Sequence, residues 1–520
     1  MSSITEQDSV PSPVLPYAAA SESESSFDRY RKLAGIALTP LAFFAADLLT
    51  AGALKANGRM LAAILSAVAV LWVTETLPLP VTAVLGACLS IILGVADAKT
   101  VLAPFADPVV FLFIGSFMLA QAMAIHGLDR RIAIGFLSVR WIGAHPSRVL
   151  FGLGTITALI SMWVSNTATA AMMLPIAIGI LQAMNQARGN QSLRNWPLAT
   201  GMMLMVAYAA SIGGIGTPVG TPPNLIGVGL IRSLAHVEIS FFRWMALACP
   251  LLLVMGAALF SMLYLLHPPR DHGATNGPAL LEYLQQQRRK LGPWTAGQVN
   301  TLIAFGVAVL LWVFPGFLSI ALSEKHPLAV FFRERLPESV IALIAAILLF
   351  VLPVKLREGR FTLSWEQAVD IDWGTILLFG GGLSLGSLMF NTGVAKVLGE
   401  HVSSLTGAST PWALTAAATA MAIFLSELTS NTAAANMIIP VVIAMAQAAG
   451  INPVPSALGA CLGASYGFML PVSTPPNAIV YGSGLVPIVK MVRAGVLFDV
   501  VGFFIILIGL RILCPLLGLA

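Results

Sequence analysis

The chain is dominated by long apolar runs separated by short polar connections, from residue 33 to its C-terminal end. The clearest runs fall within the range of about 17–25 residues that a helix needs to cross a membrane. We therefore predict an all-α polytopic membrane protein, with ordinary spans over 33–53, 60–77, 80–98, 109–126, 245–266, 297–321, 338–354, 373–393 and 495–518.

Four apolar stretches do not follow this simple pattern, namely 148–185, 197–231, 410–447 and 455–487. In the first, a Ser-Asn-Thr triplet separates the arms 149–163 and 168–185, each shorter than the roughly 20 residues of a straight crossing. Such arms indicate a re-entrant hairpin. Glycines and prolines interrupt 197–231 and 455–487, which indicates discontinuous helices. Non-helical backbone at membrane depth is tolerated where it lines a cavity, so a cavity is expected.

These interruptions occur twice, in two segments of similar sequence. Residues 161–176 read SMWVSNTATAAMMLPI and residues 426–441 read SELTSNTAAANMIIPV, at an offset of 265 residues. A Thr-Pro-Pro-Asn segment follows each, at 221–224 and 474–477, and residues 113–128 match 379–394 at nearly the same offset. The chain is therefore an internal duplication, with repeats of approximately 60–235 and 338–490. Such repeats are typical of membrane transporters whose halves share one site.

Composition excludes several functional classes. The 520 residues are 57% hydrophobic and 10% charged, whereas soluble domains carry about a quarter charged residues. The net charge of +5 is spread over the connections, which argues against nucleic-acid binding. Four isolated cysteines form no metal or disulfide pattern. No nucleophile–base pair or phosphate-binding loop is present, so we do not expect an enzyme.

The distribution of basic residues predicts the orientation. With a cytoplasmic N-terminus, the inner side receives twice as many Lys and Arg residues as the outer side. An odd number of crossings separates the repeats, so they are expected to be inverted. Residues 1–30 are polar and acidic and read as a disordered cytoplasmic tail. Residues 268–296 read as a cytoplasmic connection with a short amphipathic helix. A bacterial-type inner membrane is the expected location.

The interrupted segments carry the chemistry expected of an ion-coupled site. A Ser-Asn-Thr turn offers hydroxyls and an amide, helix N-termini present N–H groups to an anion, and C-terminal carbonyls hold a cation such as sodium. The paired prolines prevent a continuous helix and leave carbonyls free. No Lys, Arg or His lies within 161–176, 213–224, 426–441 or 467–477. Co-bound cations would offset an anion's charge, which favours cation symport over exchange.

These motifs, together with residues 72–82 (WVTETLPLPVT), resemble the divalent anion:sodium symporter family, which includes the sodium–dicarboxylate and sodium–citrate cotransporters. The resemblance covers roughly residues 30–518. It implies a homodimer whose protomers each combine a scaffold with a transport domain that moves like an elevator. The scaffold would comprise 31–147 and 297–409, and the transport domain 148–267 and 410–520.

The resemblance also implies roles for individual residues. Those expected to bind the carboxylates of the substrate are Asn166, Thr167, Thr221, Pro222, Asn431, Thr432, Thr474 and Pro475. Those expected to bind the two co-transported sodium ions are Ser161, Ser165, Asn166 and Gly220 in the first repeat, and Ser426, Thr429, Ser430, Asn431 and Ser473 in the second. Relatives often differ at Ser426, Thr429 and Ser473.

The function predicted in this way is sodium-coupled import of C4-dicarboxylates such as succinate, malate or fumarate. Alternatives are a citrate or sulfate symporter, an anion exchanger, and a proton-coupled carrier that uses Glu427. An anion channel and a sensor are further alternatives. Glu427 has either a functional role or a structural one near the membrane surface, and Glu75 and Asp107 are expected to cap or anchor span ends.

Overall fold

A computed structural model describes residues 26–143, 145–186, 189, 191–268, 277–323, 325–406 and 410–520. The first half of the chain forms α1 (Ser26–Leu49), α2 (Ala56–Thr74), α3 (Leu79–Ile92), α4 (Ala98–Leu102), α5 (Pro108–His126), α6 (Leu128–Leu137), α7 (Arg140–Gly143), α8 (Pro146–Ser161), α9 (Asn166–Gln186), α10 (Pro197–Ile215), α11 (Pro222–Ala235) and α12 (Phe241–Leu266).

The second half forms α13 (Gly277–Lys290), α14 (Ala296–Leu322), α15 (Pro327–Arg335), α16 (Glu338–Val351), α17 (Trp365–Ala368), α18 (Trp373–Asn391), α19 (Val394–Thr406), α20 (Pro411–Leu428), α21 (Asn431–Ala448), α22 (Val454–Gly463), α23 (Pro475–Gly482) and α24 (Ile488–Leu516). In the described part of the chain, 11 helices are long and apolar enough to cross a membrane. The prediction of a helical polytopic protein is confirmed.

Several details differ from the sequence predictions. The predicted spans 80–98 and 338–354 fold as α3 and α16, which have 14 residues each and are shorter than an ordinary span. A two-stranded antiparallel sheet joins β1 (Pro353–Lys355) to β2 (Arg360–Phe361), where an entirely helical chain was predicted. Residues 26–30 belong to α1 and not to a disordered tail; residues 1–25 lie outside the described part. Helix α9 has 21 residues, so the second arm of the first hairpin is as long as an ordinary span.

The four duplicated stretches fold as two pairs of helix–turn–helix units. Helix α8 ends at Ser161 and α9 begins at Asn166, while α20 ends at Leu428 and α21 begins at Asn431. The glycine- and proline-rich segments break α10 from α11 and α22 from α23. The Ser-Asn-Thr and Thr-Pro-Pro-Asn motifs therefore all lie where one helix ends and the next begins.

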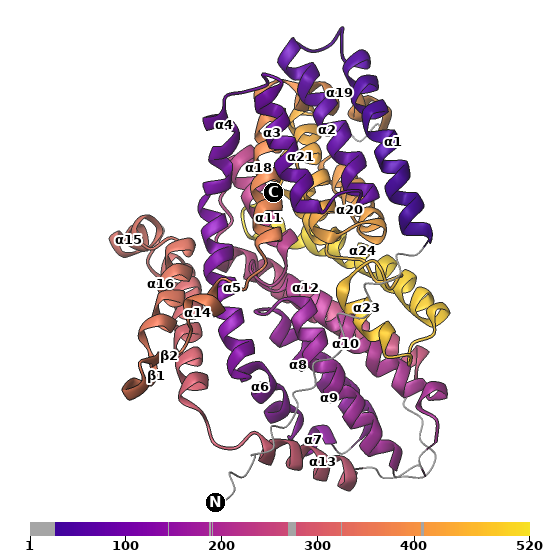
Figure 1. The fold of residues 1–520 in the computed structure, drawn as a ribbon, viewed down its shortest axis with the longest axis vertical. Coiled ribbons are helices and arrows are strands. Elements are labelled where there is room, and N and C mark those ends of the chain that lie inside the picture. Colours follow the sequence, from indigo (N-terminus) through magenta and orange to yellow (C-terminus); the bar gives the residue numbers. More distant parts are fainter. Residues whose placement is uncertain are drawn as a thin grey trace, which may run out of the picture.

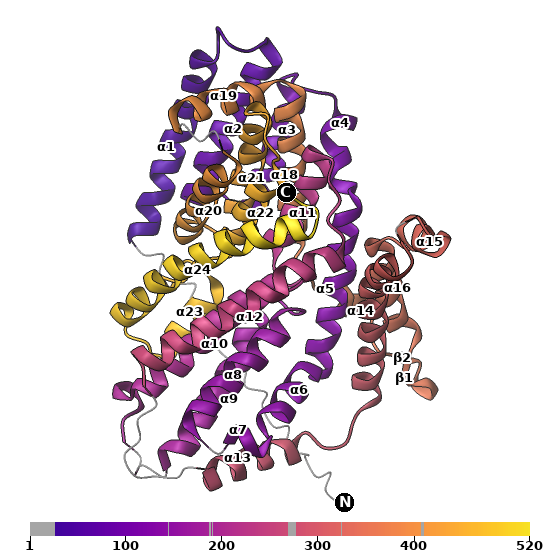
Figure 2. The ribbon, with the colours of Figure 1, turned by 180° about the vertical axis from the view of Figure 1, so that it is seen from behind.

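The broken helices cross between the two repeats (Figure 1). Helix α11 of the first repeat packs against α21 and α22 of the second, and α23 of the second packs against α9 and α10 of the first. Seen from behind, α12 and α24 run together across the middle of the molecule, with α6–α9 at one end and α2, α3 and α19–α21 at the other (Figure 2). Neither repeat is complete without the other.

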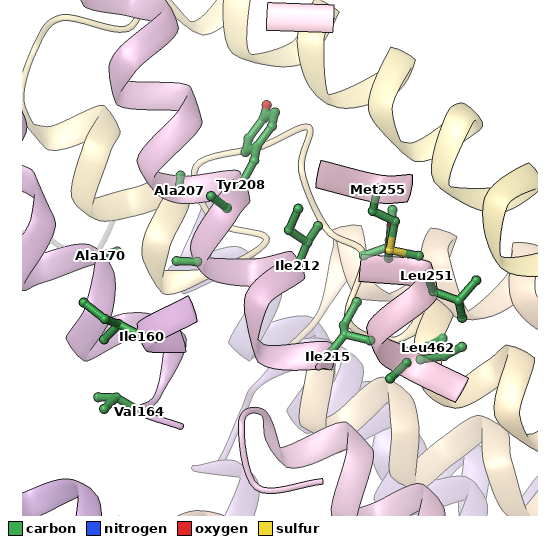
Figure 3. Close-up of a cluster of buried hydrophobic side chains, with 14 of the residues drawn as sticks. Ile160, Val164, Ala170, Ala207, Tyr208, Ile212, Ile215, Leu251, Met255 and Leu462 are labelled. Carbon is green, nitrogen blue, oxygen red and sulfur yellow. The ribbon is translucent and has the colours of Figure 1, made fainter. Parts of the chain in front are cut away.

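Helix α10 lies at the centre of this arrangement, and every residue after its first is buried. Its Ile212 and Ile215 side chains point towards the apolar cluster that includes Leu251 and Met255 of α12, whereas Tyr208 points away from α12 (Figure 3). The Tyr208 ring packs against Phe468 and Phe498. A Cβ on Gly213 would lie 2.4 Å from the carbonyl oxygen of Ala158, so glycine allows α10 to touch the backbone of α8. Close packing of this kind fixes the relative positions of the helix ends.

Candidate functional site

Both Ser-Asn-Thr turns and both Thr-Pro-Pro-Asn breaks line a single cavity of about 910 Å³. Two segments separated by more than half of the chain thus meet at one place, which follows from the crossing of α11 and α23. All of the residues that were predicted to bind substrate lie in its wall: Asn166, Thr167, Thr221, Pro222, Asn431, Thr432, Thr474 and Pro475.

Four helix N-termini open onto this cavity. Helices α9, α11, α21 and α23 begin at Asn166, Pro222, Asn431 and Pro475, and each of these residues lines it. The N–H groups of a first helical turn lack partners within the helix, and the helix dipole adds partial positive charge there. Helices α9 and α21 can offer both, whereas α11 and α23 begin with two prolines that have no N–H and contribute mainly their dipoles. Four such ends around one space create an environment suited to an anion without any basic side chain.

The two Ser-Asn-Thr turns share one hydrogen-bond pattern. The hydroxyl of Ser161 lies 2.9 Å from Asn166 Oδ1 and 2.7 Å from the carbonyl oxygen of Ala210. In the second repeat, the hydroxyl of Ser426 lies 2.7 Å from Asn431 Oδ1 and 2.9 Å from the carbonyl oxygen of Ala464. Each serine therefore sits between the hairpin turn and the broken helix and brings their oxygen atoms together.

The asparagines of the Thr-Pro-Pro-Asn segments hold the helix breaks in shape. The Asn224 amide donates to the carbonyl oxygens of Gly214 at 2.8 Å and Thr217 at 2.7 Å. The Asn477 amide donates to the carbonyl of Leu470 at 3.0 Å and to that of Gly467. Both asparagines are fully buried. We had assigned them no role, although their recurrence in both repeats was a usable signal.

The predicted sodium ligands divide into two groups. Six of them line the cavity, namely Ser165, Asn166, Gly220, Ser430, Asn431 and Ser473. The other three are buried behind it: Ser161 and Ser426 are fully buried, and the Thr429 hydroxyl donates to the carbonyl of Trp72 at 3.3 Å. Thr429 therefore contacts α2 and does not face the cavity.

The first of the two predicted cation sites has converging carbonyl groups. A Cβ on Gly220 would lie 2.5 Å from the carbonyl oxygen of Gly214 and 2.8 Å from that of Met162. Only glycine lets the chain pass so near these oxygens, and oxygen-rich pockets of this kind fit a hard cation. The second repeat has Ser473 in the place of Gly220, and its hydroxyl donates to the carboxylate of Glu427. The two predicted sites are therefore chemically different.

The cavity wall described here contains no Lys, Arg or His side chain, but it contains three carboxylates. Glu75 also pairs with Arg31 at 2.7 Å, and Asp372 caps α18 through the backbone N–H of Thr375 at 3.0 Å. Asp370 is the third. The sequence favours a capping or anchoring role for Glu75, whereas the structure also places it in the cavity wall, and no motif marks the two aspartates. They come from outside the duplicated turns and complete the wall.

Glu427 does not line the cavity. It is 2% exposed, and its Oε1 accepts from the backbone N–H groups of Phe468 at 2.5 Å and Met469 at 2.9 Å. Asp107 caps α5 through the N–H of Val109 and forms an ion pair with Arg232. The capping role predicted for Asp107 is thus present, together with a link to α11.

The sequence of almost the whole chain matches one known protein family. The description "Sodium:sulfate symporter transmembrane region" matches residues 36–519. The chain belongs to this family. Its members are sodium-coupled anion symporters, so the chain is a multi-pass transporter and not an enzyme. The resemblance drawn from the motifs is confirmed.

Alignments with individual relatives extend over most of the symporter's length. It is 36% identical to an "Uncharacterized transporter" of Haemophilus influenzae, over 86% of this chain and 89% of the relative. It is 32% identical to the sodium-dependent dicarboxylate transporter SdcS of Staphylococcus saprophyticus, over 93% and 92% respectively. The protein of the same description from Staphylococcus aureus USA300 is 33% identical, over 86% and 84%.

Two solved structures share the fold of the symporter. The YdaH transporter of Alcanivorax borkumensis has a TM-score of 0.53 at 14% identity, covering 81% of this chain and 87% of that one. The MtrF protein of Neisseria gonorrhoeae has a TM-score of 0.52 at 13% identity, covering 81% and 84%. At these identities the likeness concerns the arrangement of the helices alone.

Proposed function

We propose that this symporter imports C4-dicarboxylates such as succinate, malate or fumarate, and that the inward sodium gradient drives the import. The observation that carries the proposal is the convergence of four helix N-termini on one cavity that has no basic side chain in its described wall. A dianion would be held there by N–H groups, amides and hydroxyls, and its remaining charge would be balanced by sodium ions bound behind it. The name of the SdcS relatives supports a dicarboxylate.

We further propose that the substrate binds between Asn166 and Thr167 of the first turn and Asn431 and Thr432 of the second. Thr221, Thr474, Pro222 and Pro475 would flank it. The first sodium ion would use Ser161, Ser165, Asn166 and the Gly220 carbonyl. The second would use Ser426, Ser430, Asn431 and the backbone near Thr429 and Ser473.

Transport in this proposal is an elevator movement. Residues 31–147 and 297–409 form the scaffold, and 148–267 and 410–520 form the transport domain. The cavity wall contains Glu75 and Asp372 from the proposed scaffold as well as Asn166 and Asn431 from the proposed transport domain. A substrate at this boundary moves with one part and is released from the other side when that part shifts.

The proposed setting is a homodimer in a bacterial inner membrane with the N-terminus in the cytoplasm. The two repeats would then be inverted, with α8–α9 and α20–α21 as re-entrant hairpins that enter from opposite sides. The excess of basic residues on one side supports this orientation.

The test is uptake of radiolabelled succinate into proteoliposomes that contain the purified protein. We expect accumulation with an inward sodium gradient, little with potassium in its place, and stronger competition from malate and fumarate than from citrate or sulfate. Liposomes without protein provide the control.

Other outcomes identify the alternatives. Stronger competition by citrate or sulfate would change the substrate, and accumulation driven by a proton gradient alone would indicate proton coupling. Rapid counterflow in sodium-free vesicles without sodium-driven accumulation would indicate an exchanger and contradict the proposal.

A further inference from the structure

Two buried carboxylates interact behind the second Ser-Asn-Thr turn. Glu427, on α20, is 2% exposed, and Asp499, in the middle of α24, is 7% exposed. Gly495 lies one turn before Asp499 on α24, and a Cβ there would lie 2.5 Å from the backbone nitrogen of Met469, whose N–H donates to Glu427, so α24 brings the two acids close together. Both belong to helices that are long and apolar enough to cross a membrane, where an uncompensated charged side chain is costly.

The donors around this pair satisfy Glu427 but not Asp499. Glu427 accepts from the N–H groups of Phe468 and Met469 and from the hydroxyl of Ser473. In contrast, neither carboxylate oxygen of Asp499 has a hydrogen-bond partner within the described part of the chain. Among the described residues, no basic side chain forms an ion pair with either acid.

Two tyrosines complete the surroundings of Asp499. Tyr466 is fully buried, its ring packs against Gly502, which lies one turn after Asp499 on α24, and its hydroxyl has no hydrogen-bond partner among the described residues. The hydroxyl of Tyr208 lies 2.8 Å from the carbonyl oxygen of Phe468, the residue whose N–H donates to Glu427. Packing holds the cluster rigidly, since a Cβ on Gly502 would lie 1.9 Å from the Tyr466 ring.

We propose that Glu427, Asp499 and the Tyr466 hydroxyl form a binding site for an alkali cation, additional to the two sodium sites of the proposed function. A buried pair of carboxylates needs a positive partner, and hard cations prefer several oxygen ligands at once. A single shared proton makes one hydrogen bond, which would leave an oxygen of Asp499 and the Tyr466 hydroxyl unsatisfied. A sodium ion contacts all of them together.

The location gives such an ion a part in coupling. Glu427 follows Ser426 directly and bonds to Ser473, and both of these residues belong to the second predicted sodium site. A cation between Glu427 and Asp499 therefore joins α24 to the turn 464–474 that leads into α23. This inference rests on sodium coupling, but it can fail while sodium coupling holds.

The test counts sodium ions bound to the purified full-length protein with radioactive sodium at saturating succinate. We expect Asp499→Asn to bind one sodium ion fewer per protomer than the wild type at every pH from 6 to 8.5. Asp97→Asn is the matched control, because Asp97 is an exposed cap of α4 and asparagine is also a good cap. This control should bind as many ions as the wild type.

A second variant covers the case in which Asp499→Asn does not fold. Tyr466→Phe removes only one neutral oxygen, so we expect the apparent sodium affinity to fall by about threefold or more without a loss of thermal stability. An unchanged sodium count in Asp499→Asn, or unchanged affinity in Tyr466→Phe, would overturn the inference and assign the positive partner to a proton. Absence of sodium-dependent uptake by the wild type would instead contradict the proposed function.

Discussion

The hydroxyl of Ser161 lies 2.9 Å from the side-chain oxygen of Asn166, and this contact joins the end of one helix to the start of the next. The second repeat reproduces it between Ser426 and Asn431 at 2.7 Å. A polar contact preserved in both repeats, at the wall of one cavity, is expected of a site to which both halves contribute equally.

Removing either asparagine should abolish uptake. In Asn166→Ala and in Asn431→Ala the cavity wall loses an amide and the side-chain oxygen that accepts from a serine hydroxyl, so in the proposed site binding of both succinate and sodium should weaken by about tenfold or more. Uptake and equilibrium binding measure this. Asn57→Ala is the control, since Asn57 is exposed and lies outside the cavity wall. Near-normal transport by either alanine variant would contradict the site.

The two threonines before the proline pairs should behave differently when they are replaced. Thr474 Oγ1 accepts from the N–H of Asn477 and so caps α23, whereas the Thr221 side chain caps nothing. Thr474→Ala should therefore lower the free energy of unfolding by about 1 kcal/mol, and Thr221→Ala should change it less. Both variants should change the competition profile among succinate, citrate and sulfate. Unaltered profiles in both would remove these threonines from the substrate site.

Gly220 should tolerate no side chain. Its Cβ would lie 2.5 Å from the Gly214 carbonyl oxygen, so Gly220→Ala must move the break between α10 and α11. We expect loss of sodium-stimulated uptake and a lower melting temperature. Gly256→Ala on α12 is the matched control, because a Cβ there meets nothing within 4 Å and alanine favours a helix by about 1 kcal/mol. Equal behaviour of the two variants would contradict the cation-binding role of Gly220.

Acidification should destabilise the protein through His267, just beyond the end of α12. Burial, with Lys490 and Arg493 nearby, lowers the pKa of His267 from 6.5 to about 4. Below pH 6.5 the unfolded chain therefore binds a proton that the folded protein excludes, and stability falls as the pH drops from 6.5 towards 4. Melting temperatures across this range should fall less in His267→Gln. An identical pH profile in that variant would show that other groups cause the effect.

Much of the fold followed from the sequence because its signals are local. Apolar runs of membrane-spanning length predicted α5, α12, α14 and α24. The repeated triplets predicted the helix breaks after which α9 begins at Asn166 and α21 begins at Asn431. Helix α9 is longer than the predicted arm 168–185 because it begins with the polar residues Asn166 and Thr167 of the triplet and extends to Gln186. Propensity rules treat such residues as breakers, whereas tertiary packing overrides them here.

The parts that were missed depend on contacts distant in sequence. Asp370 and Asp372 reach the cavity from a connection without any motif, and Asp499 meets Glu427 only because α24 crosses behind α20. The crossing of α11 and α23 between repeats also has no local signal, since it arises from how the two halves pack together. Residue patterns identified the turns that line the cavity but not the neighbouring residues that complete its wall.

The most direct test of the central claim is the number of succinate molecules bound per protomer, measured by equilibrium dialysis of the purified protein with radiolabelled succinate. We predict one molecule in sodium, none in potassium, and none when either Asn166 or Asn431 alone is replaced by alanine, because the two repeats form a single site. Two molecules in the wild type, with one retained in each single variant, would show two independent sites and contradict this account.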